Sequence, residues 1–546
     1  MTHGTAPGAR LSLQTGVAEY DVPVTIAELT GSRLDDLWHR LMRRQDLRGL
    51  WSWGGPLIVV LVAAFLRLWD LSYPHELVFD ETYYVKDSWT LMHLGYESTW
   101  NSDANSYFNA GDPNHYTTSP EFLAHPPVGK WVISVGLFLF GGGSSFGWRF
   151  STAICGILLV ILTMVIAWML FRSHLLTVIA GGLLAIDGNA IVLSRVSLLD
   201  GLVALFALIG VIFMLLDRRW SQRRLDEWML RRSAAGRSTA WGPALWWRPW
   251  MLAAALMFGI TSATKWSGIY FLAGFAVYSL VSDALARRKR GLALWLSGTL
   301  LKQGPVSFLL MVPLAAVTYV VSWAGWFLHT TSYDRHWSEL AGNAWSGVLS
   351  WVPVSLQSWY HFQAEIYNYN INLHTPHPYQ AAPLTWLFLQ RPTSMFYENV
   401  GNGNSSQILD LANPLIWWAA TAAAFFLLGR AVWGAWKRKA VWREAFILTA
   451  LAAGYLPWVL FYSTRTVFQF YTIAFEPYLI LGLVAVIGIL IGQASDPRRR
   501  RVVGLRTVGV FLGLCVLLSI FFLPMWTGQP IPIWYTRLHY WFPSWI

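Results

Sequence analysis

Long apolar segments alternate with short basic clusters along most of this chain. A helix needs about 20 mostly apolar residues to cross a bilayer. Eleven segments approach or exceed that length: residues 52–70, 148–171, 174–193, 198–216, 249–264, 266–283, 303–328, 411–433, 444–463, 469–492 and 505–526. The pattern predicts an all-α protein that crosses the membrane many times.

The basic clusters predict how the spans are oriented. They are Arg40–Arg48, Arg218–Arg237, Arg287–Arg290, Lys437–Arg443 and Arg498–Arg501. Lys and Arg beside membrane helices favour the cytoplasmic side. Four predicted spans lie between the first two clusters, two between each later pair and one after the last. All five clusters therefore fit on the cytoplasmic side, with the N-terminus inside and the C-terminus outside.

One apolar segment does not fit this order. Val128–Phe140 has only 13 residues, which is too short for an ordinary span. If it crossed the membrane, the Arg218–Arg237 loop would lie outside, against the positive-inside bias. We expect it to form an amphipathic segment on the outer face.

The same pattern divides the chain into four regions. Residues 1–50 are polar and weakly patterned, which predicts a largely disordered cytoplasmic segment. Residues 51–328 form a membrane module whose first span is an uncleaved anchor and whose first outer loop covers residues 71–147. A second outer loop follows at residues 329–410, and residues 411–546 hold the last four spans.

Composition agrees with a membrane protein and excludes other classes. Of 546 residues, 55% are hydrophobic and 13% are charged, about half the charged fraction of soluble domains. The net charge of +11 does not indicate nucleic-acid binding, because Lys and Arg cluster between apolar spans. Cys155 and Cys515 lie inside predicted spans, which argues against a disulfide framework or a thiolate metal site.

The first candidate for chemistry is a pair of carboxylates, Asp80 and Glu81, in the stretch LVFDETYYVKD after the first span. They could be solvated loop residues, or acids that favour the start of a helix. Charge this close to the bilayer is costly unless it is paired, hydrated or used.

Four further charged residues lie at outer ends of predicted spans: Arg149 in WRFSTAICG, Arg195 and Asp200 in SRVSLLDG, and Lys265 in SATKWSG. Each could be a snorkelling or locally paired residue. Together with the two loop carboxylates they predict a site for an anionic lipid headgroup with a base beside it.

Such a set of residues suits one reaction. A sugar carried on a lipid phosphate has a good leaving group, which cations stabilise. The attacking hydroxyl needs a positioned carboxylate base. A single displacement inverts the anomeric centre and needs only one such base.

Five motifs, FDE, HPPVGK, WRFSTAICG, SRVSLLDG and ATKWSG, occur in this order, followed by HPYQAAPLTW, RPTSMFYENV and FYSTRTVFQFYTIAFEPYLI. The chain thereby resembles the protein O-mannosyltransferases, especially the short actinobacterial type, from about Trp51 to at least Tyr478. The resemblance implies a GT-C glycosyltransferase fold. It also implies mannose transfer from polyprenyl phosphate mannose to Ser or Thr of secreted proteins, with the Sec translocon as a candidate partner.

The resemblance also implies roles for single residues. Asp80 is expected to be the base and Glu81 its neighbouring support. Contacts to the donor phosphate or lipid are expected from Arg149, Arg195, Lys265, Gln469 and Tyr471. Supporting or acceptor-side positions are expected for His125, Lys130 and Asp200. Relatives often have a His before the Tyr where this chain reads FQFY, and the second outer loop is too short for the β-trefoil domain of eukaryotic members.

The second outer loop has its own candidates: His361, Glu365, His374, His377, Tyr379 and Trp386. The irregular spacing and the prolines of HTPHPYQ lead us to expect no helical ligand pair and no metal site. A loop that packs over the donor sugar and admits the acceptor is favoured. Trp386 could stack on a sugar or anchor the interface. No cofactor is assigned, and dependence on a divalent cation is left open.

Two other functions are alternatives to protein mannosylation. A related transferase could use a lipid or a cell-wall glycan as acceptor, which these residues do not separate from protein. A transporter of lipid-linked sugars would need paired repeats and broken spans near the midplane, which we do not find. We therefore expect an enzyme of the bacterial plasma membrane with its active site on the outer face, in contact with membrane lipids.

Overall fold

The computed structural model describes residues 45–493 and 495–546. It divides into two compact units, residues 1–55 and 56–546, and the fold below is that of the second. The expectation of disorder for residues 1–50 lies outside the described residues, except that Gln45–Leu50 begin helix α2 (Gln45–Leu68).

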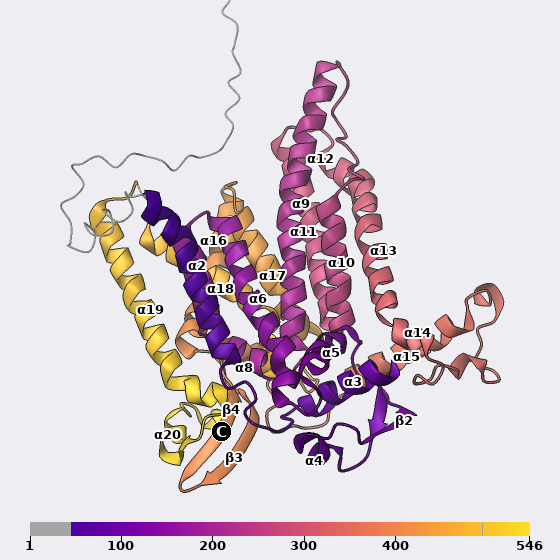
Figure 1. The fold of residues 1–546 in the computed structure, drawn as a ribbon. Coiled ribbons are helices and arrows are strands. Elements are labelled where there is room, and N and C mark those ends of the chain that lie inside the picture. The colour runs from indigo at the N-terminus through magenta and orange to yellow at the C-terminus, as the bar shows by residue number, and fades with distance from the viewer. Residues whose placement is uncertain (1–44, 494) are drawn as a thin grey trace, which may run out of the picture. The chain divides into compact units, whose positions relative to one another are not determined.

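Apolar helices make up most of the fold (Figure 1). After α2 come α6 (Ser145–Phe171), α7 (His174–Ala185), α8 (Gly188–Arg195), α9 (Asp200–Ala234), α10 (Pro249–Thr264), η2 (Trp266–Gly268), α11 (Ile269–Lys289), α12 (Trp295–Ser297), η3 (Gly298–Gln303), α13 (Gly304–Ser322), α16 (Pro414–Trp436), α17 (Trp442–Phe461), α18 (Glu476–Ile491) and α19 (Arg498–Thr527).

Each of the eleven predicted spans coincides with one of these helices or with two consecutive helical elements, such as α7 and α8. Among the described residues, seven helices are long and apolar enough to cross a membrane, and the bent pair α7–α8 makes an eighth. The apolar part of α2 and the helices α10 and α18 are shorter. The multi-pass, helical class is confirmed, while the number of eleven spans stays a prediction.

Polar residues set several helix boundaries, as their capping chemistry requires. The Ser144 side chain accepts a hydrogen bond from the Gly147 N–H at the start of α6. Asp187 accepts one from the Asn189 N–H and begins α8 after α7 has ended, where the pair bends by 58°. The third predicted span is therefore broken near its end.

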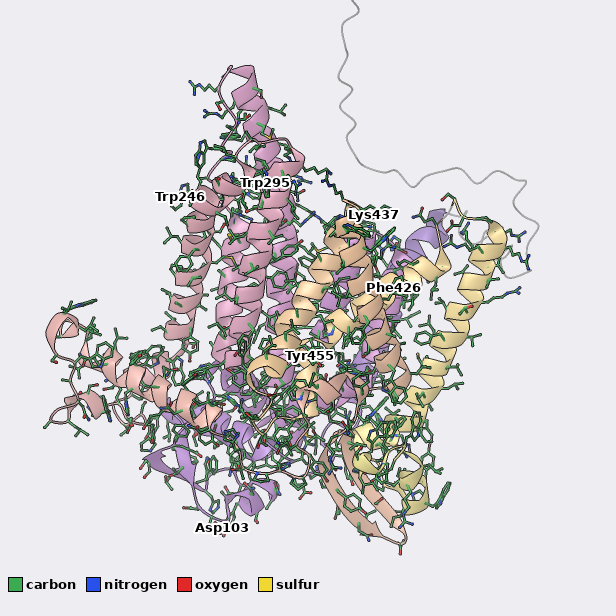
Figure 2. All side chains as sticks on the ribbon, turned by 180° about the vertical axis from the view of Figure 1, so that it is seen from behind. Asp103, Trp246, Trp295, Phe426, Lys437 and Tyr455 are labelled. Carbon is green, nitrogen blue, oxygen red and sulfur yellow. The ribbon has the colours of Figure 1, made fainter. Side chains whose placement is uncertain are left out.

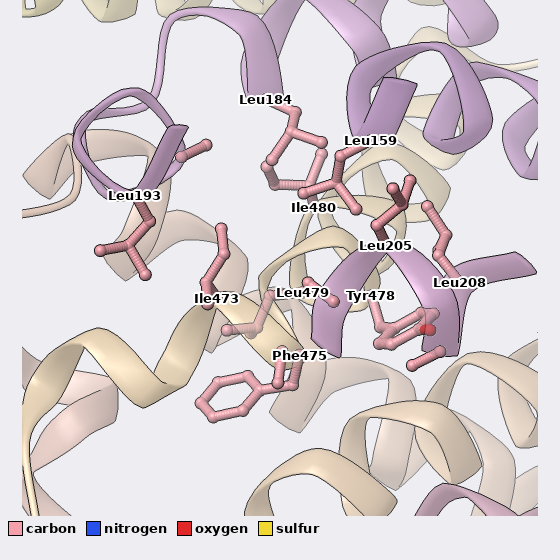
Figure 3. Packing of buried hydrophobic residues seen from close by; sticks show 14 of the residues in the cluster. Leu159, Leu184, Leu193, Leu205, Leu208, Ile473, Phe475, Tyr478, Leu479 and Ile480 are labelled. Carbon is pink, nitrogen blue, oxygen red and sulfur yellow. The ribbon is translucent and has the colours of Figure 1, made fainter. Parts of the chain in front are cut away.

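The core lies between α6, α7, α8, α9 and α18 (Figure 3). Leu159, Leu184, Leu205 and Ile480 from four of these helices are almost fully buried there. Between membrane helices such side chains stabilise the fold through close van der Waals packing, because lipid is as apolar as the protein core. This packing gives a rigid base under the segments that carry the charged residues.

Both predicted outer loops lie at one end of the bundle (Figure 1). The first contains α3 (Glu81–Leu94), β1 (Ser98–Trp100), α4 (Ala104–Asn109), β2 (Tyr116–Pro120) and α5 (Val128–Phe140). The second contains α14 (Ala324–Leu328), η4 (Trp337–Glu339), η5 (Gly347–Leu349), α15 (Val354–Ile371), η6 (Pro383–Phe388), β3 (Thr393–Gly401) and β4 (Asn404–Asp410).

The basic and the loop-bearing ends are opposite. In Figure 2, Lys437, Trp246 and Trp295 lie at one end of the bundle and Asp103 at the other. The C-terminus, with β5 (Ile531–Pro532), α20 (Ile533–Leu538) and η8 (Pro543–Trp545), lies at the loop end (Figure 1). This arrangement agrees with the charge pattern of the sequence.

Two small antiparallel sheets at the loop end were not predicted. Strands β1 and β2 pair Ser98 with Pro120. Strands β3 and β4 form a hairpin around Asn402-Gly403, both with positive φ. Asn-Gly between two strands is a strong hairpin signal, and the expected second outer loop, residues 329–410, contains this hairpin. Strand β5 adds to β4 through Ser405 and Ile531.

Candidate active site

Two buried arginines hold the segment that leads from α2 to α3. Arg195, at the end of α8, donates to the carbonyl oxygens of Trp69 at 2.6 Å and Asp70 at 2.9 Å. Arg149, in the first turns of α6, donates to the carbonyl oxygens of Pro74 and Glu76, both at 2.9 Å. The loop before Asp80 is thus fixed by side chains from two membrane helices.

Glu81 is fully buried and bonded on both oxygens. It accepts two 2.8 Å hydrogen bonds from Arg149, one from the Ser197 N–H at 2.8 Å and one from the Val78 N–H at 3.0 Å. Such a bidentate, charge-assisted pair is strong and geometrically specific. Glu81 therefore has no free lone pair directed at a substrate and acts as a structural anchor.

Asp80, the residue beside it, is in the opposite situation. It is the N-cap of α3, yet its side chain makes no capping bond, and its carboxylate is half-buried. Within the described part of the chain, no hydrogen bond or ion pair to this carboxylate is found. Burial raises the pKa of Asp80 to about 6, although the positive charge of Lys265 opposes the rise. It is thus a free carboxylate suited to take a proton near neutral pH.

The backbone immediately before Asp80 is strained. Phe79 has a φ of 49°, a conformation that non-glycine residues seldom adopt. Its ring is held edge-on by Phe468 and Phe470, each at 5.7 Å between centroids, and by His377 at 6.0 Å. Such strain persists only where surrounding packing enforces it, and it is common at functional sites.

Lys265 is near enough for its charge to act on the Asp80 carboxylate. It lies just after α10 and bonds both oxygens of Asp200, at 2.9 and 3.0 Å. Its ammonium also stands 3.9 Å above the ring of Tyr471. The predicted cation and carboxylate of the two outer turns are therefore brought together, and Tyr471 from η7 (Gln469–Ala474) joins them.

A cavity opens beside Lys265 and encloses about 470 Å³, including the part open to solvent. Its walls come from the loop before α5, the start and first turn of α11, the end of α15 and the end of α17: His125, Lys265, Trp266, Ser267, Tyr270, Tyr367, Asn370, Ile371, Trp458, Tyr462 and Arg465. The walls are aromatic with two cations, which suits a ligand that has both a sugar ring and an anionic group.

Arg465 is the second cation of this cavity and was not predicted. It is only 8% exposed and donates to the Asn370 side chain at 3.0 Å. Its Nε–H is buried without a partner. A buried, unsatisfied guanidinium donor is costly unless a ligand completes it. The signal was the motif FYSTRTVFQF, which carried the family resemblance but to which no role was assigned.

His125 and Lys130 of HPPVGK lie in different surroundings. The His125 ring packs 6.0 Å from that of Tyr84, one turn along α3 from Asp80. Burial, with the nearby Lys265, Arg465 and Lys130, holds the pKa of His125 well below its usual range, so it is neutral. Lys130 bonds Asp87 at 3.0 Å and Glu97 at 3.1 Å, which ties α5 to α3 rather than entering the cavity.

Four other predicted residues, Trp386, Gln469, His377 and His374, do not line the cavity beside Lys265. Trp386 is fully buried, and its carbonyl accepts from Gln469 at 3.0 Å, so it forms core under η7 rather than an exposed stacking platform. The second Gln469 amide atom, Oε1, is buried without a partner. His377 packs on Phe468 at 5.0 Å. His374 is exposed and bonds the Thr464 carbonyl.

Arg149 and Arg195 do not face the cavity as donors to a phosphate. All five N–H groups of Arg149 are engaged, by Glu81 and by the carbonyls of Leu71, Pro74 and Glu76. Arg195 donates to backbone carbonyl oxygens at the end of α2 and in the segment after it. In this structure both position the loop that carries Asp80.

The expectation of no helical ligand pair in the second outer loop is wrong. His361 and Glu365 lie one turn apart on α15, with His361 Nε2 3.4 Å from a Glu365 oxygen. The prolines of HTPHPYQ come after α15 has ended and do not affect this earlier pair.

Known proteins resemble the chain over most of its length. Residues 57–328 match the family model described as dolichyl-phosphate-mannose-protein mannosyltransferase. Residues 355–545 match the C-terminal four-membrane-helix region of protein O-mannosyltransferases.

Curated relatives carry the same kind of name. The polyprenol-phosphate-mannose–protein mannosyltransferases of Mycolicibacterium smegmatis and Mycobacterium tuberculosis are each 31% identical, covering 90% and 91% of this chain and 93% and 92% of theirs. The one of Corynebacterium glutamicum is 27% identical over 91% of this chain and 93% of its own.

Among solved structures, the donor-bound Saccharomyces cerevisiae protein O-mannosyltransferase Pmt1–Pmt2 complex superimposes with a TM-score of 0.66. The match covers 91% of this chain and 92% of that chain at 14% identity. It confirms the GT-C fold. With the two family models and the 31% identical relatives, it follows that this chain is a glycosyltransferase of the protein O-mannosyltransferase family.

Proposed function

We propose that this protein transfers mannose from polyprenyl phosphate mannose to Ser or Thr hydroxyls of secreted proteins, with Asp80 as the base. One observation carries the proposal: an unpaired carboxylate, Asp80, lies within electrostatic reach of Lys265, which lines a cavity with two cations and aromatic walls. The names of the curated relatives supply the sugar, the lipid and the class of acceptor.

The donor phosphate is placed between Lys265 and Arg465. Asp200 neutralises Lys265, whereas Arg465 has no carboxylate partner among the described residues and keeps a free Nε–H. The cavity lining therefore offers two cations and no carboxylate to the donor phosphate. Tyr270, at the start of α11, and Tyr462, directly after α17, are joined by a 2.7 Å hydrogen bond between their hydroxyls and line the cavity beside these two membrane helices. In this proposal the lipid chain of the donor enters between them.

The chemistry is a single displacement. Asp80 takes the proton of the Ser or Thr hydroxyl while its oxygen attacks the anomeric carbon. The bond from that carbon to the phosphate oxygen breaks, and the phosphate keeps the electron pair. Lys265 and Arg465 stabilise the charge that develops there. The configuration of the product is opposite to that of the donor.

Arg149, Arg195 and Glu81 act as positioning residues in this proposal. They hold the loop before Asp80 and leave that carboxylate as the free member of the pair. Effective catalysis depends on such fixed geometry.

The proposal places the site on the outer face of the plasma membrane. The two loops and the C-terminus share one end of the bundle, and the basic cluster at Lys437 lies at the other (Figures 1 and 2). Basic segments favour the cytoplasm, so the N-terminus is placed there too. An acceptor chain emerging from the Sec translocon would meet the site from the outer side. The division into residues 1–50, 51–328, 329–410 and 411–546 belongs to the same proposal.

An acceptor panel tests this function. Purified protein receives radiolabelled polyprenyl phosphate mannose and, in separate reactions, a Ser/Thr-rich peptide, its Ala-substituted form, a lipid acceptor and a cell-wall glycan fragment. Label in the Ser/Thr peptide alone is expected. Label only in the lipid or the glycan would replace the protein acceptor with the alternative transferase function.

A further inference from the structure

A second cluster of potential ligands lies in the second outer loop and is not used by the proposed reaction. His361 and Glu365 project from α15, and Asp334 follows α14 in the preceding segment. One ligand atom from each of the three lies within 4.8 Å of the others. Three side chains of metal-ligating types from two chain segments therefore lie close together.

Glu365 lies within hydrogen-bonding range of both Asp334 and His361, but the contacts made by the histidine are long for such bonds. His361 Nε2 lies 3.4 Å from Glu365 Oε1 and 3.8 Å from Asp334 Oδ2, whereas charge-assisted hydrogen bonds are about 2.7–2.9 Å long. Two ligands that each lie about 2.1 Å from a tetrahedral Zn²⁺ are roughly 3.4 Å apart. The 3.4 Å separation of His361 and Glu365 therefore equals one edge of such a coordination shell, and the 3.8 Å separation of His361 and Asp334 is slightly longer.

The cluster is also preorganised. The His361 ring stacks flat on Trp337 at 3.6 Å and 5°, which fixes the direction of its Nε2. Asp334 has a φ of 51°, a left-handed conformation that Asp adopts more readily than most residues. Fixed ring orientation by a second group is a common feature of metal-binding histidines.

The charges of the cluster are unbalanced. Two carboxylates repel one another here, and Glu365 Oε2 is buried without a hydrogen-bond partner. No Lys or Arg forms an ion pair with Asp334 or Glu365 in the described ranges. The adjacent Arg335 is turned toward the Phe327 carbonyl and the Trp326 ring. A positive ion between the three side chains would supply the missing charge.

We propose that Asp334, His361 and Glu365 bind one divalent transition-metal ion of the Zn²⁺ type, with water at the remaining position. Imidazole nitrogen and carboxylate oxygen are both ligand types that Zn²⁺ accepts. The ion clamps the segment after α14 to α15. Because α15 also carries Tyr367 and Asn370 of the cavity, the clamp sets where that wall of the active site stands.

Metal binding by the full-length protein tests the site without any transfer reaction. The protein is purified without a polyhistidine tag, stripped with EDTA and titrated with Zn²⁺ by calorimetry and with Co²⁺ by visible absorption. We expect one ion per chain and Co²⁺ bands typical of four- or five-fold coordination. His361→Ala, Glu365→Gln and Asp334→Asn should each weaken Zn²⁺ binding by at least about tenfold.

His336→Ala is the matched control. His336 forms an exposed pair with Glu339 at 2.8 Å in the same segment, but no third ligand joins it in the described residues. This variant should bind Zn²⁺ as the wild type does. If His361→Ala does not elute as a monodisperse protein, Asp334→Asn decides the question.

Two results would overturn the proposal. One is the absence of stoichiometric Zn²⁺ and Co²⁺ binding to the wild type. The other is binding that all three ligand variants retain or that His336→Ala reduces equally. Neither result depends on mannosyl transfer, so failure of the metal site is distinguishable from failure of the proposed function.

Discussion

Arg149 donates two hydrogen bonds of 2.8 Å to the two carboxylate oxygens of Glu81. The pair is fully buried and joins α6 to the first turn of α3. It leaves Asp80, the adjacent residue, as the carboxylate that is free to meet a substrate. Two neighbouring acids thereby acquire different roles through the partners that the fold provides.

Glu81→Gln is expected to destabilise the protein. Breaking a buried ion pair leaves an uncompensated charge and costs about 3–5 kcal/mol. The temperature at which the detergent-solubilised protein loses its monodisperse elution peak should fall clearly. Glu444→Gln is the control, because it removes a carboxylate from the half-exposed Arg430–Glu444 pair, which is worth about 0–1 kcal/mol. Equal effects of the two changes would contradict the structural role of Glu81.

Arg465→Ala is expected to raise the KM for polyprenyl phosphate mannose by roughly 10- to 100-fold, since a hydrogen bond to a charged group contributes about 1.5–3 kcal/mol. Initial rates at varied donor concentration measure it. Arg391→Ala removes an arginine from the same loop end whose donors go to the carbonyls of Pro378, Ser544 and Ile546, so its donor KM should be unchanged. An unchanged KM in Arg465→Ala would remove this residue from the phosphate site.

The rate of transfer should fall as the pH drops below about 6. Asp80 must be deprotonated to act as a base, and its pKa is raised to about 6. At pH 5 only about a tenth of the plateau kcat/KM should remain. A pH profile of kcat/KM between pH 4.5 and 8 measures this acidic limb. A rate that stays constant down to pH 4.5 would show that no such carboxylate limits the reaction.

Lys265→Met should move that acidic limb toward higher pH. The Lys265 charge lowers the pKa of Asp80, while Asp200 raises it. Removing Lys265 takes away the first effect and leaves the Asp200 carboxylate unpaired, so both changes raise the pKa of Asp80. The pH profile of the variant checks the sign independently of the expected loss in donor affinity. A limb that moves to lower pH, or does not move, would separate Lys265 from Asp80.

The membrane class and the positions of the helices follow from the apolar pattern, because hydrocarbon demands long apolar segments with internally bonded backbones. The motifs of the sequence also led to Asp80, Lys265 and Tyr471, which the fold brings close to one another. These residues occupy helix ends and outer turns, where their placement depends mainly on local sequence.

The hydrogen-bond acceptors of Arg149 and Arg195 could not be predicted from the sequence. Arg149 and Arg195 were expected at the donor phosphate, but their acceptors are carbonyls of the segment 66–76 and, for Arg149, also the Glu81 carboxylate. Sequence reveals a cation and not which distant backbone faces it. Arg465 was missed for the converse reason, since its importance lies in a free donor inside a cavity that four chain segments enclose.

Asp80→Asn most directly tests the central claim that Asp80 is the base of mannosyl transfer. The substitution keeps the shape of the side chain, which has no hydrogen-bond partner in the described protein, and it replaces the basic carboxylate with a neutral amide that cannot accept the proton. The measurement is single-turnover transfer from radiolabelled polyprenyl phosphate mannose to the Ser/Thr peptide, with donor binding followed on the same sample. The account predicts wild-type elution, retained donor binding and a rate lower by about 10²–10⁴-fold. Transfer at a rate near that of the wild type would contradict it.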